Sequence, residues 1–569
     1  MAGKILGIDL GTTNSCMAIA EGILPTVIPN REGGRTTPSI VAFREDGSTL
    51  VGLPAKRQAA LNPADTVYSA KRLMGRKYED PEVKSLYHLL PYAIGRDPGN
   101  GDVRIRIREK LISPPEVSAL VLRKLREDAE RYLGGDVDKA IVTVPAYFND
   151  SQRQATKDAG AIAGLDVARI INEPTAAALA SGLGGKQDML VAVYDLGGGT
   201  FDISILEIAR GIFEVKATNG NTYLGGDDFD ARIAAWLIED FKKKEGIDLH
   251  EDPKAMQRLK DAAETAKIEL SSSDQVTIAL PFITKDKSIE IPITRQQLEE
   301  MTKDLVDKTE GPCRKAFDSA KITARDIDTV VLVGGMTRMP RVVQKVKEIF
   351  GKQPYARVNP DEVVAAGAAL QGSIMGGEIA EVLLLDVTPL SLGVRTVGDG
   401  FKVIIEKNTT IPIRKSEIFT TTEENQSFVN IAVFQGDSEK ASQNHPLGEF
   451  QLVGIKPMAA GKPRIDVAFE INADGILHVT AKDKDTGQKQ SIVIKPSTGL
   501  DREMVDRLAA KAAHSTTGSI SLAPAESPAK PVFTPPAAPS AKPASPQTFK
   551  FPVDSDDSGT PPPPPPPLV

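Results

Sequence analysis

Cysteine is scarce in this chain, because Cys16 and Cys313 are the only two among 569 residues. Two cysteines cannot form the disulfide framework of a secreted scaffold, so we expect a reducing compartment. Runs of 18 apolar residues are also lacking, which argues against a membrane-spanning helix. The N-terminus has no signal or transit character, because the first strand begins by Lys4. We therefore expect a cytoplasmic protein with no membrane partner.

An excess of positive charge and the commonest nucleotide-binding motifs are lacking as well. The net charge of −7 argues against nucleic acid as the main partner. The sequence contains no G-x-x-x-x-G-K-[ST] run and no G-x-G-x-x-G after a strand, so P-loop and dinucleotide-binding folds lose their main support. The composition, with 41% apolar and 25% charged residues, is that of an ordinary globular protein. Its length fits about three or four domains.

The most informative pattern that is present occurs twice, at 5–14 and at 191–202. Each copy reads as an apolar strand, a tight Asp-Leu-Gly turn with small hydroxyl residues, and a second strand. Glycines let the backbone approach an anion, and successive N–H groups in such a turn form an anion-binding nest. Asp9 and Asp195 open the two turns and would repel phosphate unless a divalent cation lies between them. The pattern therefore predicts a duplicated domain that clamps a nucleoside triphosphate and its metal.

Strands and helices alternate along residues 4–375, which predicts a two-lobed α/β unit. Helices are expected at 116–132, 151–164 and 254–271. A short buried strand at 330–335 reaches a glycine turn, and a helix is expected at 341–350. Ligands collect at this strand-to-helix edge of α/β sheets, so the turn is a candidate seat for adenosine. A plain strand-to-helix turn would have the same appearance.

The sequence changes character near residue 378, and the region that follows reads as strands, including 428–434, 465–471 and 476–479. A hairpin turn joins the last two, so this region predicts a separate β-sandwich. A short amphipathic helix comes next, followed by a proline-rich stretch that cannot bury a core and is expected to be disordered. The expected boundaries are 1–377 for a nucleotide-binding domain, 378–389 for a linker, 390–498 for the β-sandwich, 499–514 for the helix and 515–569 for the tail.

These residues resemble the 70-kDa heat-shock chaperone family, specifically its bacterial DnaK type, over about residues 4–510. The resemblance implies an actin-like, ribonuclease H-like ATPase domain in two lobes, followed by a β-sandwich that binds peptides. It also implies an ATP-dependent chaperone that takes part in protein folding and the stress response. Besides the two phosphate turns, the motifs that carry it lie at 142–150, 171–177, 334–340, 359–362, 382–386 and 408–412.

The resemblance implies roles for individual residues of the ATPase domain. ATP or ADP and Mg²⁺ are the implied cofactors, and K⁺ is a further candidate. The residues implied in hydrolysis are Lys71, Glu173, Asp195, Thr200 and Asp9. Asp9, Asp195 and Asp202 would hold the metal, mostly through water. Nucleotide contacts are implied for Gly11, Thr12, Thr13, Asn14, Gly197, Gly198, Gly199, Glu264, Lys267, Ser271, Gly334, Gly335, Arg338 and Asp361.

Further roles fall on the β-domain and on the connection between the domains. A hydrophobic peptide cleft is implied at Val394, Thr396, Val397, Phe419, Thr422, Val429, Ile431 and Ile465, with Val397 and Thr422 arching over the peptide. Without the resemblance, most of these positions would be read as the core of the sandwich. Coupling between the domains is implied for Pro145, Arg153, Leu383, Leu384, Leu385 and Asp386. We expect a monomer, and the implied partners are unfolded hydrophobic polypeptides, a J-domain co-chaperone and a nucleotide exchange factor.

The chain departs from the family pattern after the β-domain, where a helical lid of about a hundred residues normally follows. Here one short helix gives way to the proline-rich stretch, which puts slow release of peptide in doubt. Two other functions stay open. A small-molecule kinase of the same superfamily would use the phosphate turns but would leave 390–495 unexplained. A scaffold would recruit groove-binding modules through its proline-rich tail, but the complete set of expected catalytic residues argues against an inactive ATPase.

Overall fold

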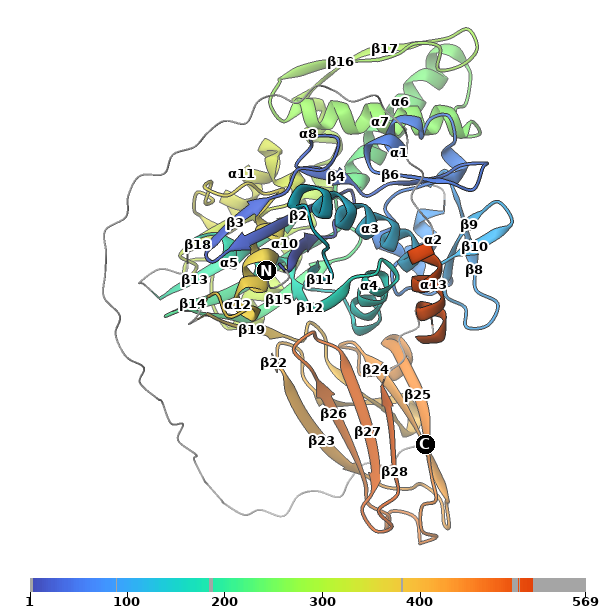
Figure 1. Ribbon diagram of the computed structural model, residues 1–569, viewed down its shortest axis with the longest axis vertical. Coiled ribbons are helices and arrows are strands. Elements are labelled where there is room, and N and C mark those ends of the chain that lie inside the picture. Colours follow the sequence, from blue (N-terminus) through green and yellow to red (C-terminus); the bar gives the residue numbers. More distant parts are fainter. Residues whose placement is uncertain are drawn as a thin grey trace.

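The computed structural model describes residues 4–87, 90–183, 188–379, 382–493, 500 and 502–514 (Figure 1). The expected tail at 515–569 lies outside the described residues. Within them, two α/β lobes are followed by a β-sandwich, which confirms the predicted fold class for this part of the chain. No helix in these ranges is long and apolar enough to cross a membrane.

Lobe I is built on a sheet with the strand order β12–β11–β1–β2–β3, to which β4 adds beside β2. Side chains of β2 alternate between its two faces: Met17 and Ile19 join one buried cluster, whereas Cys16 and Ala18 join another. The main elements of lobe I are β1 (Leu6–Asp9), β2 (Asn14–Glu21), β3 (Leu24–Val27), β4 (Thr36–Pro38), β11 (Lys139–Val144), β12 (Asp166–Asn172), α3 (Pro114–Leu133), α4 (Asp150–Ile162), α5 (Glu173–Ala180) and α12 (Val363–Met375).

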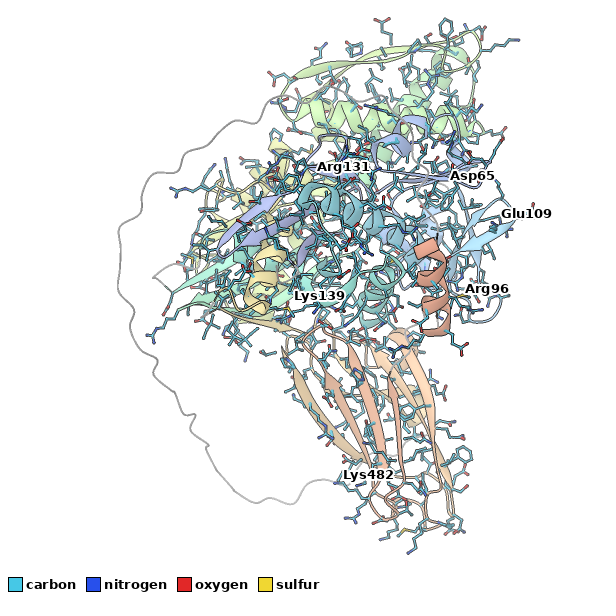
Figure 2. All side chains as sticks on the ribbon, in the orientation of Figure 1. Asp65, Arg96, Glu109, Arg131, Lys139 and Lys482 are labelled. Carbon is cyan, nitrogen blue, oxygen red and sulfur yellow. The ribbon has the colours of Figure 1, made fainter. Side chains whose placement is uncertain are left out.

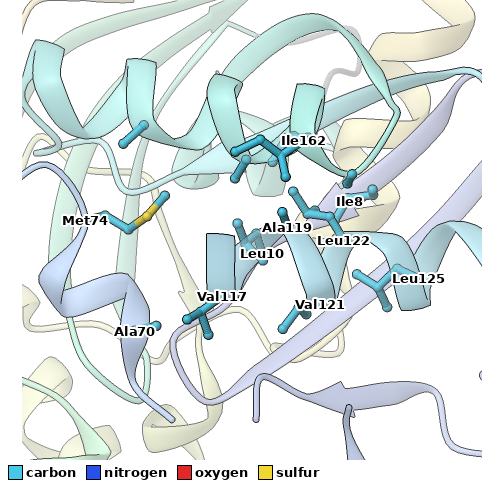
Figure 3. Close-up of a cluster of buried hydrophobic side chains, with 14 of the residues drawn as sticks. Ile8, Leu10, Ala70, Met74, Val117, Ala119, Val121, Leu122, Leu125 and Ile162 are labelled. Carbon is cyan, nitrogen blue, oxygen red and sulfur yellow. The ribbon is translucent and has the colours of Figure 1, made fainter. Parts of the chain in front are cut away.

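Two helix layers enclose this sheet. Apolar side chains of α3 and α4, such as Leu122 and Ile162, meet Ile8 of β1 in one layer (Figure 3). On the other side α12 crosses β1 so closely that a Cβ on Gly7 would lie 2.2 Å from the backbone nitrogen of Ala369. Glycine is therefore required at position 7, and the close crossing holds the start of the first phosphate turn rigidly in place.

Lobe II repeats the central arrangement of lobe I. β13 pairs antiparallel with β14 and parallel with β18, as β1 does with β2 and β11. The duplication predicted from the two turns is therefore present in the strand pairing. The main elements are β13 (Met189–Leu196), β14 (Phe201–Ala209), β15 (Ile212–Asn221), β18 (Thr329–Val333), α6 (Gly226–Glu245), α7 (Pro253–Leu270), α10 (Glu310–Ala320) and α11 (Pro340–Phe350).

Smaller elements extend both lobes. The helices predicted at 116–132, 151–164 and 254–271 appear as α3, α4 and α7, with shifts of one or two residues at their ends. The additional elements are β5 (Val41–Phe43), β6 (Thr49–Val51), α1 (Leu53–Gln58), η1 (Pro63–Asp65), β7 (Thr66–Val67), η2 (Ala70–Leu73), α2 (Pro81–Leu86), β8 (Ala93–Arg96), β9 (Val103–Ile107), β10 (Lys110–Ile112), β16 (Gln275–Leu280), β17 (Ile289–Thr294), α8 (Arg295–Met301), α9 (Lys303–Asp307) and η3 (Gly335–Arg338).

The β-domain consists of two four-stranded sheets, β21–β20–β24–β25 and β23–β26–β27–β28. The three strands predicted here appear as β24, β26 and β27, and their inward side chains form one apolar core. The domain contains β20 (Leu392–Thr396), η4 (Val397–Asp399), β21 (Gly400–Ile405), β22 (Thr410–Ile411), β23 (Ile413–Phe419), β24 (Phe428–Gln435), η5 (Ala441–Gln443), β25 (His445–Val453), β26 (Ile465–Ile471), β27 (Leu477–Asp483) and β28 (Lys489–Val493).

The linker joins the domains as a strand rather than as a free tether. β19 (Leu383–Val387) pairs parallel with β15 of lobe II and antiparallel with β22 of the β-domain. The β-sandwich, predicted to be separate, therefore contributes the edge strand of the lobe II sheet. The last helix among the described residues, α13 (Arg502–His514), packs against α4 of lobe I, where Val505 is buried (Figure 1). It begins near the expected boundary of 499.

Candidate functional site: a cleft between the two lobes

A cavity of about 320 Å³ lies between the lobes and is lined by both phosphate turns. It brings together nearly all residues predicted for nucleotide binding and hydrolysis. The predicted residues in its wall are Asp9, Gly11, Thr12, Thr13, Asn14, Lys71, Glu173, Asp195, Gly197, Gly198, Thr200, Glu264, Lys267, Ser271, Gly334, Gly335, Arg338 and Asp361. Gly199 and Asp202 lie behind this wall, and the roles of the whole set stay predictions.

Glycine is needed in the turns because the two lobes approach each other there. A Cβ on Gly198 of lobe II would lie 1.8 Å from the hydroxyl oxygen of Thr13 in lobe I. A second close approach lies within lobe II, where a Cβ on Gly334, whose φ is +83°, would lie 2.4 Å from the carbonyl oxygen of Leu196. The Thr13 hydroxyl is buried without a hydrogen-bond partner among the described residues. A buried donor of this kind is suited to a ligand oxygen, such as one of a phosphate.

Four carboxylates converge at the base of the cleft: Asp9, Glu173, Asp195 and Asp202. Burial, followed by the charge of Glu173, raises the pKa of Asp9 and raises the pKa of Asp195 well above its usual value. The same two causes raise the pKa of Asp202 to about 8. So many acidic groups in one buried site favour a cation beside them.

The donor set fits a hard cation such as Mg²⁺, which prefers oxygen ligands and retains several of its waters. Within the described ranges, no three histidine, cysteine or acidic side chains lie close enough together to hold a metal directly. That the metal is held mostly through water stays a prediction. Asp202 is not among the residues that line the cavity, and one of its carboxylate oxygens accepts a hydrogen bond of 3.1 Å from the backbone N–H of Tyr147.

Lys71 is buried in the wall of the cleft. η2 places its ammonium 2.6 Å from the carbonyl oxygen of Leu10 and 2.6 Å from a carboxylate oxygen of Glu173. The ammonium also lies 5.6 Å from the centre of the Phe148 ring. From the sequence alone this residue reads as an ordinary solvated lysine. The structure instead gives it a fixed position beside the carboxylates, where it provides positive charge.

The opposite end of the cleft is formed by α7 and by the turn after β18. Lys267 lies 2.7 Å from Asp230 and donates a 3.1 Å hydrogen bond to the carbonyl oxygen of Gly226. Arg338 lies 2.6 Å from Asp361. Asp230 and Gly226 also line the cavity but were not predicted, since single residues in α6 carry no spacing signal. The other unpredicted lining residues are Thr36, Ile268, Val333, Met336, Met339, Pro360 and Val364.

The residues predicted for the peptide cleft have two different environments. Val394, Phe419, Val429, Ile431 and Ile465 are each 0% exposed and form part of the sandwich core. Thr396 is half-buried, whereas Thr422 is exposed and Val397 is 54% exposed. The structure therefore brings the five apolar side chains together, but as closed core that a peptide cannot reach in this conformation.

The residues predicted for coupling meet at the junction of both lobes and the linker. The buried Arg153 side chain donates hydrogen bonds to Asn172 (2.7 Å) and to the carbonyl oxygens of Phe148 and Ala146, close to Pro145. Asp386 accepts a hydrogen bond of 3.1 Å from Thr175. The three linker leucines, Leu383, Leu384 and Leu385, differ in burial: Leu384 is 8% exposed, Leu383 is 50% exposed and Leu385 is intermediate.

Direct polar contacts between lobe I and the β-domain were not predicted. Asp150 accepts a 2.7 Å hydrogen bond from the backbone N–H of Leu477, and its own N–H donates to Gln435. Lys157 lies 2.7 Å from Asp474. Asp474 belongs to a turn whose residue types already explain a hairpin, so the sequence gives no signal for a second role.

Comparison with known protein families agrees with this architecture. A family model described as Hsp70 protein matches residues 5–520, which is most of the 569-residue chain. The match covers both lobes, the linker strand and the β-sandwich. The chain therefore belongs to the Hsp70 family.

Proposed function

We propose that the chain is an ATP-dependent molecular chaperone that binds exposed hydrophobic segments of unfolded proteins. Hsp70 proteins are in general chaperones with ATPase activity. The observation that carries the proposal for this chain is the cleft between the lobes. There two glycine turns, the carboxylates of Asp9, Glu173 and Asp195 and two buried lysines, Lys71 and Lys267, line a cavity of about 320 Å³. This set of groups suits a triphosphate and a divalent cation.

ATP or ADP with Mg²⁺ is the proposed ligand of the cleft. The Thr13 hydroxyl and the backbone N–H groups beside Gly198 would hold the phosphates. Asp9, Asp195 and Asp202 would hold the metal through its waters, and K⁺ is a further candidate for the same oxygen-rich site. Bound Mg²⁺ would supply positive charge next to the phosphates. The adenosine would lie toward Lys267 and Arg338.

Hydrolysis of ATP is assigned to the residues around Lys71. Its ammonium is fixed by Leu10 and Glu173 and would offset the charge that develops on the transferring phosphoryl group. Glu173 would orient the attacking water, and Thr200 would position the phosphate from the second turn. Positioning and charge stabilisation supply most of the catalysis in phosphoryl transfer, and these are the two contributions that the proposed residues would make.

Coupling between nucleotide and peptide is assigned to the linker strand. Burying a leucine such as Leu384 against lobe II contributes roughly 1.5–3 kcal/mol, which is comparable to the free-energy gap of many two-state switches. Release of β19 from β15 would free the β-sandwich from the lobes and change access to its core. A J-domain co-chaperone would act near Arg169, Asn172 and Asp386, and an exchange factor would replace ADP.

The finer details are proposals from the same resemblance. We infer a bacterial DnaK-type protein that acts as a monomer in the cytoplasm and in the stress response. The two free, buried cysteines are compatible with a reducing compartment.

A single-turnover ATPase assay tests the proposed function. The full chain with Mg²⁺ and radiolabelled ATP should hydrolyse the bound nucleotide, and a leucine-rich peptide should accelerate the reaction. Transfer of phosphate to an added sugar instead of to water would favour a small-molecule kinase. Absence of nucleotide binding would leave a scaffold as the remaining function and would overturn the proposal.

A further inference from the structure

A second cavity, of about 510 Å³, lies between the two lobes on the far side of Asp230 from the nucleotide cleft. Lobe I contributes Tyr68 and the end of α2, and lobe II contributes α6 and α7. Much of its wall is apolar, including Leu86, Leu90, Ala231, Ala234, Ile238 and Met256. Its volume and its mixture of apolar walls with a few polar groups are typical of small-molecule sites.

Gln257 of α7 lines this cavity and carries an unpaired acceptor. Its side-chain N–H₂ donates a 2.9 Å hydrogen bond to the carboxylate of Asp261, which fixes the orientation of the amide. The reverse orientation would place the carbonyl oxygen against that carboxylate. In the observed orientation the carbonyl oxygen is buried and has no hydrogen-bond partner among the described residues. A buried acceptor that lacks a partner is suited to a donor on a ligand.

Lys260 lies three residues further along α7, so its side chain and that of Gln257 share one face of the helix. The ammonium lies 4.1 Å from the centre of the Tyr68 ring and 4.0 Å from a carboxylate oxygen of Asp227. These contacts hold the charge in place, but 4.0 Å is too long for a hydrogen bond. The ammonium therefore retains donors for a ligand next to the free acceptor of Gln257.

We propose that this second cavity binds a small aromatic molecule that carries a neutral amide. The amide N–H would donate to Gln257, and the amide oxygen would accept from Lys260. The ring would pack on the apolar side chains of α2 and α6. A carboxylate in the same place would be disfavoured, because it has no N–H to donate and would place a second acceptor against the carbonyl oxygen of Gln257.

A ligand here would contact both lobes at once. Asp230 lies in the wall of both cavities, and it also holds Lys267 of the nucleotide cleft at 2.7 Å. Occupation of the second cavity would therefore resist separation of the lobes and slow the escape of ADP. This second consequence rests on the proposed function, whereas binding of the ligand does not.

The test uses benzamide as the probe and the full chain saturated with Mg²⁺ and ADP, so that the nucleotide cleft is blocked. Saturation-transfer NMR should detect binding with a dissociation constant on the order of 1 mM, as expected for so small a molecule. Gln257→Met should weaken binding at least fivefold, and Ala231→Phe should abolish it by filling the cavity. The matched control Gln275→Met, at an exposed position of β16, should bind as the wild type does. Benzoate should bind at least fivefold more weakly than benzamide.

Failure of benzamide to bind, or equal binding by wild type, Gln257→Met and Ala231→Phe, would overturn the site. Release of a fluorescent ADP analogue gives the second readout, and saturating benzamide should slow it at least twofold in wild type but not in Gln257→Met. Binding without slower release would overturn only the effect on the lobes. A chain that binds benzamide but not ADP would overturn the proposed function and leave the second site standing.

Discussion

The nucleotide cleft and the predicted peptide cleft differ in how much of each site exists before a ligand arrives. The nucleotide cleft is an open cavity of about 320 Å³ whose walls are glycine turns and charged side chains. The five apolar residues of the peptide cleft are each 0% exposed and hold the β-sandwich together. A site made of charges and backbone turns can stay open, because those groups gain little from packing together. A site made of core residues has to open first, so its affinity depends on a conformational equilibrium.

The largest effect is expected in the preformed site. Lys71→Ala should lower the single-turnover rate of ATP hydrolysis by about 10²-fold or more, because it removes the buried positive charge beside Glu173. Nucleotide binding should change little, since both glycine turns remain. Lys139→Ala is the matched control, because Lys139 is exposed on the surface of lobe I (Figure 2). A Lys71→Ala rate within about threefold of wild type would contradict the assignment.

Coupling between the nucleotide cleft and the peptide cleft should depend on Leu384 and not on its neighbour Leu383. Leu384→Asp places a charge in the apolar contact with lobe II, which a charged group cannot occupy without a partner. Peptide should then no longer stimulate the ATPase, while basal hydrolysis continues. Leu383→Asp is the control, because Leu383 is 50% exposed and Leu384 only 8%. If peptide stimulates the ATPase of Leu384→Asp as strongly as that of Leu383→Asp and the wild type, β19 only tethers the two domains.

A substitution in the closed site should affect folding and binding together. Val429→Phe overpacks the core of the β-sandwich, which should destabilise that domain by about 1–3 kcal/mol and weaken binding of a leucine-rich peptide. Calorimetry of the full chain should show a lower transition for the β-domain, with an unchanged ATPase rate in the absence of peptide. Val397→Phe is the control for stability, because Val397 is 54% exposed and a larger side chain there should not overpack the core. Unaltered peptide affinity in a stably folded Val429→Phe variant would show that Val429 does not line the peptide cleft.

The same contrast explains what the sequence could predict. The turns at 10–13 and 196–200 each need glycine because other atoms approach their backbone closely. Residue type and spacing together are therefore enough to identify these turns in the sequence. Val429 and Ile431 show the alternation of any buried strand, and only the family resemblance separates a peptide site from plain core. Asp150 and Asp230 act through partners far away in the sequence, at Leu477 and Lys267. Such single polar residues carry no pattern, so their roles emerge only when the chain is folded.

The smallest effect is expected at the interface that joins the two regions, where Asp150 is buried between lobe I and the β-domain. Burial raises the pKa of Asp150 to about 7, although the N–H of Leu477 and the charge of Arg153 oppose the shift. Undocking would expose the carboxyl group and return its pKa toward 3.8. Between about pH 3.8 and 7 docking therefore takes up a proton, so the docked state gains stability as the pH falls through this range and loses it as the pH rises through about 7. Protection of the β19 amides against hydrogen exchange, corrected for intrinsic rates, should be about tenfold greater at pH 6 than at pH 8. Asp150→Asn should reduce this ratio to less than threefold, with the amides of β13 as an internal control, and an unchanged ratio would assign the pH dependence to another group.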